Sequence, residues 1–419
     1  MCDHKGVSIQ NMSPPQHQIP EPLKGSEKGT WAEQSIVERL PAILRRTRDE
    51  NDFPAAIDDL LNELESEIPG GPIRHLRDPH APDSGDWQAY IAPYQGEDWL
   101  QPPWFFVEHY FYRRIMEAVS YFEGGPDPFM QQKEKGLRKA ETMILPLASK
   151  VREGLKSGPP CVPFIKEMMY LNLWGNQGDL SLWPADSEKT PDHTDLDKAN
   201  DHLLADDSDQ AALILQERGE SQLVVDFLID NAGFELVSDL AFADLLLSGD
   251  WASKVRFHVK RHPTFVSDAV VKDVEHTISV LSASKRDPIS QLGNRLQGHA
   301  AAARVSIHPD FFWNSPLAFW DLPERLVRFL GQADLLFSKG DANYRRLLGD
   351  RHWNFQLPFD SVVDYLPVPL VALRVLKADV VVGLTPREIY KARTADPRWM
   401  VDGRWGVIQF SPPKYEGRG

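Results

Sequence analysis

The chain has 419 residues, of which 42% are hydrophobic, so it can bury a substantial core in two or three domains of ordinary size. Its net charge of −15 repels phosphate backbones and argues against a general nucleic-acid binder. Only two cysteines, Cys2 and Cys161, are present, which argues against a disulfide scaffold and a thiolate zinc site. No stretch has the apolar length of a signal peptide or a membrane span, so we expect a cytoplasmic or nuclear protein without membrane contact.

The first part of the chain contains a polar tail and a helical region. Residues 1–29 are polar and rich in proline, and we expect a disordered tail there. From residue 30 to residue 178 apolar residues recur at helical spacing, which predicts a helical N-terminal domain. The segments with this spacing are 36–44, 57–64, 104–122 and 127–155, and a loop is expected at 69–86.

An acidic segment follows the helical region. Residues 186–209 carry many carboxylates and few apolar side chains, which is typical of a solvated loop. We therefore expect residues 179–220 to form a linker or an insertion, and the sequence indicates no role for it.

Beyond residue 221 the pattern changes to an α/β one that continues to residue 419. Apolar β-rich runs alternate with helical segments, which predicts βαβ units and a mostly parallel sheet. The handedness of such crossovers places helices on both faces of the sheet. The expected strands are 222–229, 255–259, 304–307, 335–338 and one within 370–382; the expected helices are 234–247, 270–281, 323–330 and 343–348.

Asp230 and Asn231 stand where the first of these strands ends and a helix begins. In open α/β sheets, ligands bind outside the carboxyl ends of the strands. A carboxylate and an amide side by side offer the hard oxygen ligands that suit Mg²⁺ or Mn²⁺, and the following helix N-terminus favours an anion. A simple turn with an asparagine cap explains the same two residues, and on this motif alone it is the more common outcome.

Asp268 follows the next predicted strand and supplies a third oxygen ligand if the two strands are neighbours. The alternative is a helix N-cap before the segment that begins at residue 270. Neither interpretation is favoured by the local sequence.

Lysines and a glycine mark two further strand ends. Gly340 allows close approach of the backbone to a ligand, and Lys339 beside it brings a positive charge suited to phosphate. Asp341 is our candidate for orienting a water molecule or substrate hydroxyls, and Asn343 either caps a helix or binds an oxygen. Lys377 stands in an apolar run, where it binds either a phosphate or, as a strand-edge residue, water.

Together these motifs provide oxygen ligands and lysines at strand ends, which is the equipment for transferring a phosphoryl group to water. The sequence lacks the motifs of several other enzyme classes. The chain contains no Walker A sequence, no HExxH, no Gly-x-Ser-x-Gly elbow and no multi-glycine dinucleotide loop.

Eight short motifs, in order, carry a resemblance to a known family from about Trp31 to the end of the chain. They are Trp-Phe-Phe-Val-Glu at 104–108, Tyr-Arg-Arg-Ile at 112–115, Leu-Trp-Gly-Asn at 173–176, Asp-Leu-Ser at 179–181, Asp-Asn-Ala-Gly at 230–233 followed by Glu235, Phe-Val-Ser-Asp at 265–268, Lys-Gly-Asp-Ala-Asn-Tyr-Arg at 339–345 and Arg-Val-Leu-Lys at 374–377. The chain resembles the damage-control phosphatases, once grouped as domain of unknown function eighty-nine. Within them it is most similar to the third subgroup, which includes fungal sugar-phosphate phosphatases.

The resemblance implies an α/β/α sandwich with a helical N-terminal domain and a divalent metal, Mn²⁺, Mg²⁺, Co²⁺ or Ni²⁺, held by Asp230, Asn231 and Asp268. It implies sugar phosphates such as fructose 1-phosphate and fructose 6-phosphate as substrates, with residues 339–343 and Lys377 lining the phosphate and sugar. One departure is Val375, where the subgroup has threonine, so a hydrogen bond from that hydroxyl is lost.

Three residues of the helical region, Glu108, Arg113 and Asn176, are also expected to bind substrate. The alternative is a buried polar network that ties this region to the sheet. Two rival functions stay open: an S-adenosylmethionine-dependent methyltransferase of protein carboxylates, and a non-catalytic interaction protein. The leading hypothesis is a metal-dependent phosphatase whose partner is a small phosphorylated metabolite.

Overall fold

The computed structural model describes residues 14–156, 161–175, 201–219 and 223–412. In this part of the chain seven strands form one sheet with the order β1-β7-β6-β5-β2-β3-β4. All neighbouring strands are parallel except β6 and β7, which are antiparallel. The strands are β1 (Leu203–Asp206), β2 (Leu223–Leu228), β3 (Ala252–Lys260), β4 (Val305–Asp310), β5 (Leu335–Lys339), β6 (Leu370–Val375) and β7 (Gly406–Ser411).

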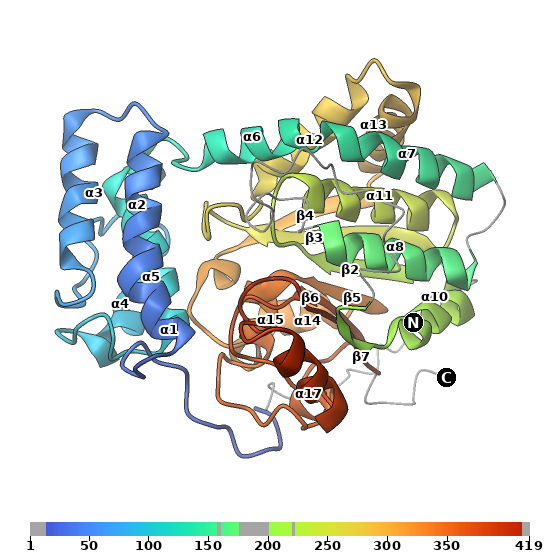
Figure 1. Cartoon of the computed structure of the whole chain (residues 1–419). Coiled ribbons are helices and arrows are strands. Elements are labelled where there is room, and N and C mark those ends of the chain that lie inside the picture. The colour runs from blue at the N-terminus through green and yellow to red at the C-terminus, as the bar shows by residue number, and fades with distance from the viewer. Residues whose placement is uncertain (1–13, 157–160, 176–200, 220–222, 413–419) are drawn as a thin grey trace, which may run out of the picture.

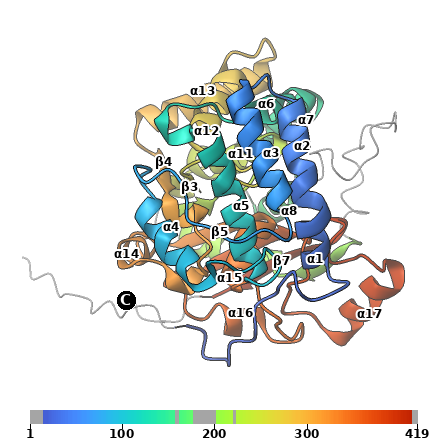
Figure 2. The same ribbon diagram turned by 90° about the vertical axis from the view of Figure 1, so that its left-hand side faces the viewer.

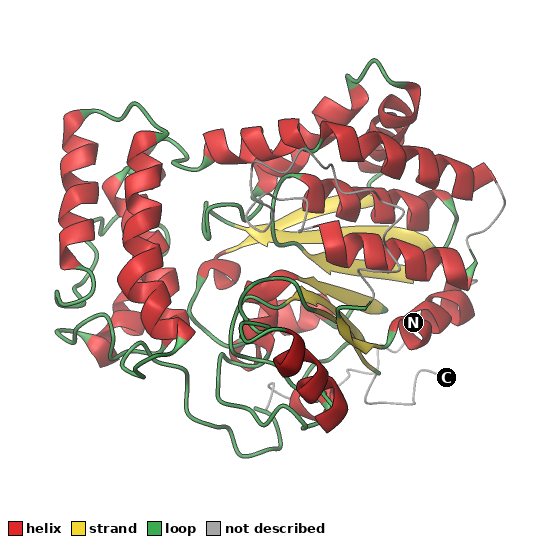
Figure 3. Cartoon of the chain, in the orientation of Figure 1, coloured by secondary structure: helices red, strands yellow, loops and turns green. Residues whose placement is uncertain are grey.

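Helices cover both faces of the sheet, with the strands between them (Figure 3). Side chains of successive strand residues point to opposite faces. Phe227 of β2 and Phe337 of β5 therefore stack in one apolar core, at 4.8 Å between ring centroids, whereas Leu228 and Leu336 belong to the core on the other face. The predicted α/β fold with a mostly parallel sheet is confirmed.

In Figure 1 the first of these cores lies between the sheet and helices drawn above it, and the second lies between the sheet and helices drawn below it. The first face carries α7 (Glu141–Lys156), α8 (Val162–Trp174), α10 (Ser208–Gly219), α11 (Phe234–Ser248), α12 (Val271–Ser282) and α13 (Asp287–Ala301). The second carries α14 (Glu324–Leu330), α15 (Gly340–Leu347), α16 (Phe359–Val362) and α17 (Pro386–Ala395).

The N-terminal helices form a separate stack on the left of Figure 1, which Figure 2 shows face on. Nearly every residue of its central helix α5 is buried, because α5 packs both on its neighbours and on the second core. The stack contains α1 (Trp31–Gln34), a π-helical turn (Ser35–Arg39), α2 (Leu40–Asp49), α3 (Ala55–Glu67), α4 (Ser84–Ile91) and α5 (Trp104–Ala118).

The predicted helix over 127–155 is wrong, because the structure divides it into α6 (Met130–Lys139) and α7, with a break at Ala140. Gly136 lies one turn before the break, and glycine weakens a helix interior. Helices α7 and α8 share the first core with the sheet. The division of the chain into domains stays a prediction.

The expected disorder of residues 14–29 is also wrong. Leu23 is only 2% exposed. Its N–H donates to the carbonyl of Asp350 at 3.1 Å, and its carbonyl accepts from the N–H of Trp104 at 2.8 Å. Leu23 and further backbone contacts, such as the pairing of Pro22 with Arg351, thus attach this proline-rich segment to both parts of the molecule.

Three elements on one side of the sheet, β1, α10 and β7, escaped the sequence analysis. Residues expected to lie in an acidic linker form β1 and α10, and β7 was not predicted. Strand β1 has only four residues, of which Leu204 is buried, so its pattern is too short to detect. None of the described helices is long and apolar enough to span a bilayer.

Candidate metal and phosphate site

The three predicted metal ligands come together at the carboxyl ends of β2 and β3. These strands are parallel neighbours, with Leu228 opposite His258. Asp230 and Asn231 directly follow β2, and the backbone of Asn231 pairs with that of Asp268. The N–H of Ala269 donates to the Asp230 carbonyl at 2.8 Å and locks the two loops together. The expectation that neighbouring strand ends would bring these residues together is met.

Hydrogen bonds orient the Asn231 amide. Its Nδ2 donates to Asp230 Oδ2 at 2.8 Å and to Glu235 Oε2 at 2.9 Å, while its Oδ1 accepts from Ser267 Oγ at 2.5 Å. Asp230 Oδ1 and Asp268 Oδ2 are buried and accept no hydrogen bond. Unsatisfied buried carboxylate oxygens are unfavourable unless another group pairs with them.

The electrostatics of these carboxyl groups suit the binding of a cation. Burial, followed by the nearby Asp268 and Glu235, raises the pKa of Asp230 well above its usual value. Burial also raises the pKa of Asp268 to about 6, although Lys260 opposes the shift. Hard oxygen donors in this state suit a divalent cation. The described residues contain no group of three or more His, Cys, Asp or Glu that could hold a metal, so the set depends on the Asn231 amide.

Gly340 lies against the first ligand. Its φ of +81° is left-handed, and a Cβ atom there would stand 1.9 Å from Asp230 Oδ2. Only glycine allows the junction between β5 and α15 to come this close to the Asp230 carboxylate. Asn343, one turn further on, donates to the Ile229 carbonyl at 3.2 Å and the Lys339 carbonyl at 2.9 Å, which ties α15 to the end of β2.

Lys339 is directed elsewhere than we expected. Its Nζ donates to Asp239 Oδ1 at 2.6 Å and lies 3.5 Å from Glu235 Oε1, so the ammonium faces helix α11. Glu235 in turn accepts from the Asn231 amide. In this structure Lys339 therefore supports the ligand loop through Glu235, and its predicted contact with substrate phosphate stays a prediction.

Hydrogen bonds link Asp341 to the end of β6 and the loop that follows it. Asp341 Oδ1 accepts from Arg374 Nε at 2.9 Å and from the N–H of Lys377 at 3.0 Å. Burial favours the neutral acid, but Arg374 and Arg345 outweigh it and lower the pKa of Asp341. An ionised Asp341 thus holds the Lys377 backbone, and the positive charge of Lys377 acts on Asp230. The predicted role of Asp341 in orienting water stays a prediction.

Lys260, at the end of β3, was missed. It is 1% exposed, its Nζ donates to the Trp313 carbonyl at 2.8 Å, and it lies 3.4 Å from Asp268 Oδ2. A lysine that closes an apolar strand was the available signal, the same one that singled out Lys377. The loop between Lys260 and Asp268 is strained, since the non-glycine residues Phe265 and Val266 have φ of 48° and 69°.

The helical region contributes one predicted residue beside the site. Glu108 is buried on α5, and it accepts from Arg345 Nη1 at 2.5 Å and from Arg39 Nη1 at 3.0 Å. Arg345 belongs to α15, so this ion pair joins the helical stack to the helix that begins at Gly340. Asn176, and Asp179 beyond it, lie outside the described residues.

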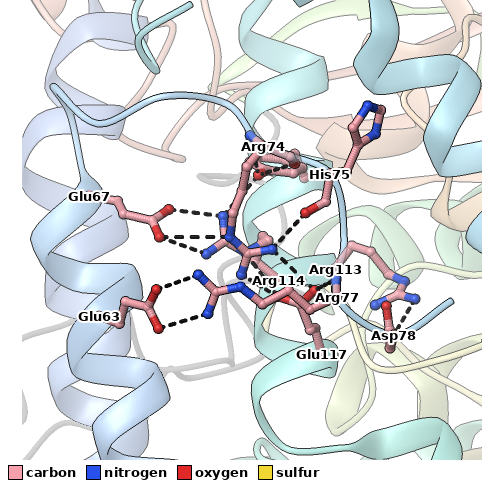
Figure 4. Close-up of polar contacts among 10 residues, drawn as sticks. Glu63, Glu67, Arg74, His75, Arg77, Asp78, Arg113, Arg114 and Glu117 are labelled. Atoms are coloured by element: carbon pink, nitrogen blue, oxygen red, sulfur yellow. Dashed lines mark hydrogen bonds and ion pairs between the residues drawn. The ribbon is translucent and has the colours of Figure 1, made fainter. Parts of the chain in front are cut away.

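Arg113 belongs to an arginine network between α3 and α5 (Figure 4). It donates to Asp83 through Nε and Nη2, at 2.8 and 2.9 Å, and to Asp78 at 2.8 Å. Its neighbour Arg114 makes two hydrogen bonds to Glu67 of α3. The alternative interpretation, a buried polar network, describes Arg113 better than substrate binding does. The network consists of Glu63, Glu67, Arg74, Arg77, Asp78, Asp83, Arg113, Arg114 and Glu117.

An Arg113→Met variant separates these interpretations. Removing one partner of a buried ion pair leaves Asp83 uncompensated and lowers the free energy of unfolding by about 3–5 kcal/mol. We expect urea denaturation to show this loss while KM for a phosphorylated substrate stays at the wild-type value. If KM rises under conditions in which the variant is fully folded, Arg113 binds substrate after all.

Two buried histidines make stability depend on pH. Burial is the largest cause that lowers the pKa of His262 to about 4, and it also lowers the pKa of His109 well below its usual value. An unfolded histidine binds its proton near pH 6.5, so both residues stabilise the fold above that pH, and this stability is lost as the pH falls towards the folded pKa. From about pH 8 to about pH 6, we expect His262 alone to remove about 1 kcal/mol.

Urea denaturation at these two pH values, with EDTA present, measures the effect. A His262→Asn variant is the comparison, because an amide can replace the Nδ1 contact to the Pro263 carbonyl, 3.0 Å away, without titrating. The pH dependence should be smaller in the variant, and identical slopes in both proteins would refute the assignment.

Comparison with known proteins shows the family of the chain. Residues 28–392 match the family model of the damage-control phosphatase ARMT1-like domain. The damage-control phosphatase ARMT1 of Danio rerio is 32% identical over 446 residues, covering 95% of this chain and 98% of that protein. For the Mus musculus protein of the same name the identity is 31%, with 93% of this chain and 98% of that protein covered.

A crystal structure of a DUF89 family protein from Pyrococcus horikoshii superposes with a TM-score of 0.46 and 14% identity, covering 90% of this chain and 97% of that one. The match of the family model over most of the chain is decisive, and identity above 30% along nearly the full length of the curated relatives accords with it. The chain belongs to the damage-control phosphatase family with an ARMT1-like domain.

Proposed function

We propose that this chain is a metal-dependent phosphatase that hydrolyses small phosphorylated metabolites in the cytoplasm, with sugar phosphates such as fructose 1-phosphate and fructose 6-phosphate as substrates. Family membership supports phosphatase activity on damaged metabolites. One observation supports the metal: Asp230 Oδ1 and Asp268 Oδ2 are buried oxygen atoms without a hydrogen-bond partner, in carboxyl groups whose pKa is raised.

Asp230, Asn231 and Asp268 would hold the ion, for which Mn²⁺ and Mg²⁺ are the first candidates and Co²⁺ and Ni²⁺ the next. Such an ion supplies positive charge against the phosphate oxygens. The positive charge of Lys260 balances the negative charge of Asp268, and the positive charge of Lys377 acts on Asp230. These lysines would stabilise the charge that develops on the transferred phosphoryl group.

Removal of metal tests the proposal. Protein treated with EDTA and then dialysed should release no phosphate from fructose 1-phosphate or fructose 6-phosphate, and adding one of the four divalent ions should restore release. Equal rates with and without EDTA would contradict metal dependence. Titration with S-adenosylmethionine in the same preparations is the control for the methyltransferase alternative, for which tight binding without metal is the signature.

A further inference from the structure

Two tyrosines on helix α5 differ in one respect. Tyr110 and Tyr112 are both fully buried, at 0% exposure. The Tyr110 hydroxyl donates to the Arg74 carbonyl at 2.8 Å and accepts from Arg114 Nη1 at 2.8 Å. The Tyr112 hydroxyl has no hydrogen-bond partner among the described residues. A buried hydroxyl without a partner is destabilising, so this position needs a reason other than stability.

Tyr112 lies on the side of α5 that faces the loop carrying Asp268, a proposed metal ligand. It follows Glu108 by one helical turn, so both side chains share a face of α5. Its ring centroid is 5.1 Å from that of Phe265, in the strained loop that carries Asp268. Glu108 pairs with Arg39, whose side chain is 41% exposed, so the polar cluster around Tyr112 reaches the surface there.

The charges that act on the Tyr112 hydroxyl agree with this position. Burial raises the pKa of Tyr112, and the charges that act on it most are those of Arg39, Glu108 and Asp268. The hydroxyl therefore stays protonated and can both donate and accept a hydrogen bond. The charges of Glu108 and Arg39 act on it without a hydrogen bond to either, and the rings of Phe129 and Phe265 pack against its ring, with centroids 5.9 and 5.1 Å away.

We propose that the Tyr112 hydroxyl binds a hydroxyl group of the sugar part of the substrate and so selects polyol phosphates over other phosphate esters. The inference rests on the function proposed above and deepens it. A sugar hydroxyl supplies the donor and acceptor that Tyr112 lacks, and the carbon face of a sugar matches the surrounding rings. The phosphate itself has other partners, the cations and oxygen ligands at the strand ends.

Paired variants test the role. Tyr112→Phe and Tyr110→Phe each remove one buried hydroxyl from the same helix. For each variant and the wild type, KM and kcat are measured with fructose 6-phosphate and with p-nitrophenyl phosphate, which has no sugar hydroxyls. Tyr112→Phe should raise KM for fructose 6-phosphate about fivefold, as the loss of one neutral hydrogen bond predicts, and leave KM for p-nitrophenyl phosphate unchanged.

Stability of the ligand-free protein gives a second readout. Tyr112→Phe should keep or raise the Tm, because an unpaired hydroxyl is removed, whereas Tyr110→Phe should lower it by breaking hydrogen bonds and leave both KM values at wild type. Equal KM values for Tyr112→Phe and wild type with fructose 6-phosphate overturn the inference but leave the phosphatase intact. A KM raised equally for both substrates also overturns it. A wild type that hydrolyses only p-nitrophenyl phosphate overturns the sugar-phosphate proposal, and this role with it.

Discussion

An Asp230→Ala variant is expected to release phosphate at least about a thousandfold more slowly than the wild type at saturating Mn²⁺. Asp230 provides a buried carboxylate oxygen without a hydrogen-bond partner, and charge stabilisation by a metal accounts for several kcal/mol of a phosphatase barrier. Phosphate release from fructose 6-phosphate across a Mn²⁺ titration measures the loss. Turnover near the wild-type rate would remove Asp230 from the proposed metal site.

The same variant should fold well without metal, which separates loss of the site from loss of structure. Removing Asp230 relieves its repulsion with Asp268 and Glu235, so its Tm in EDTA should equal or exceed that of the wild type, and Mn²⁺ should raise it less. Asp244→Ala is the matched control. That aspartate is also buried in this domain, but it pairs with Arg295 at 2.7 Å, so its loss should lower the Tm and preserve the Mn²⁺ response.

A Gly340→Ala variant should lose most of its activity, on the order of a hundredfold, because the new Cβ would overlap Asp230 Oδ2 and displace the carboxylate. Steady-state kinetics with fructose 6-phosphate and a Mn²⁺-induced Tm shift measure the effect. We expect a weaker metal response as well as slower turnover.

Gly96→Ala separates crowding from backbone strain. Gly96 has φ +86°, and a Cβ atom added there would have no neighbouring atom within 4 Å, so alanine brings only the left-handed strain of about 1–2 kcal/mol. This control should be less stable but fully active. If both variants keep wild-type activity, the close approach of Gly340 to Asp230 is not required for catalysis.

The centre of the sheet was predictable from sequence, and with it the meeting of the proposed ligands. Strands β2, β5 and β6 are mostly apolar runs because both faces of a parallel sheet are buried, and Val255, Phe257 and Val259 of β3 alternate with polar residues. Polar residues at their carboxyl ends must then lie on one edge, which is where Asp230, Asp268 and Gly340 are found. The β1 side of the sheet carries a weaker signal: the edge strand β1 has only four residues, and β7 beside it breaks the parallel pattern because it runs antiparallel to β6.

The directions of long charged side chains were not predictable in the same way. Lys339 ends a strand next to the site, but Asp239, which lies one turn beyond Glu235 on α11, binds its ammonium. Arg113 belongs to a shared motif with its neighbour, yet both pair with acidic residues from other segments. Such partners are distant in sequence, and no local pattern of charge or spacing indicates them.

The place of β7 also bears on how the chain is assembled as it is synthesised. In the described structure β1 pairs with β7 alone, and the amide of Asp207, just after it, donates to Ile408 in the last strand. Leu23, from the opposite end of the chain, is held by the backbone of Asp350. Segments that emerge early must therefore wait for late ones, and the nascent polypeptide exposes the unpaired edge of β1 until β7 has been synthesised.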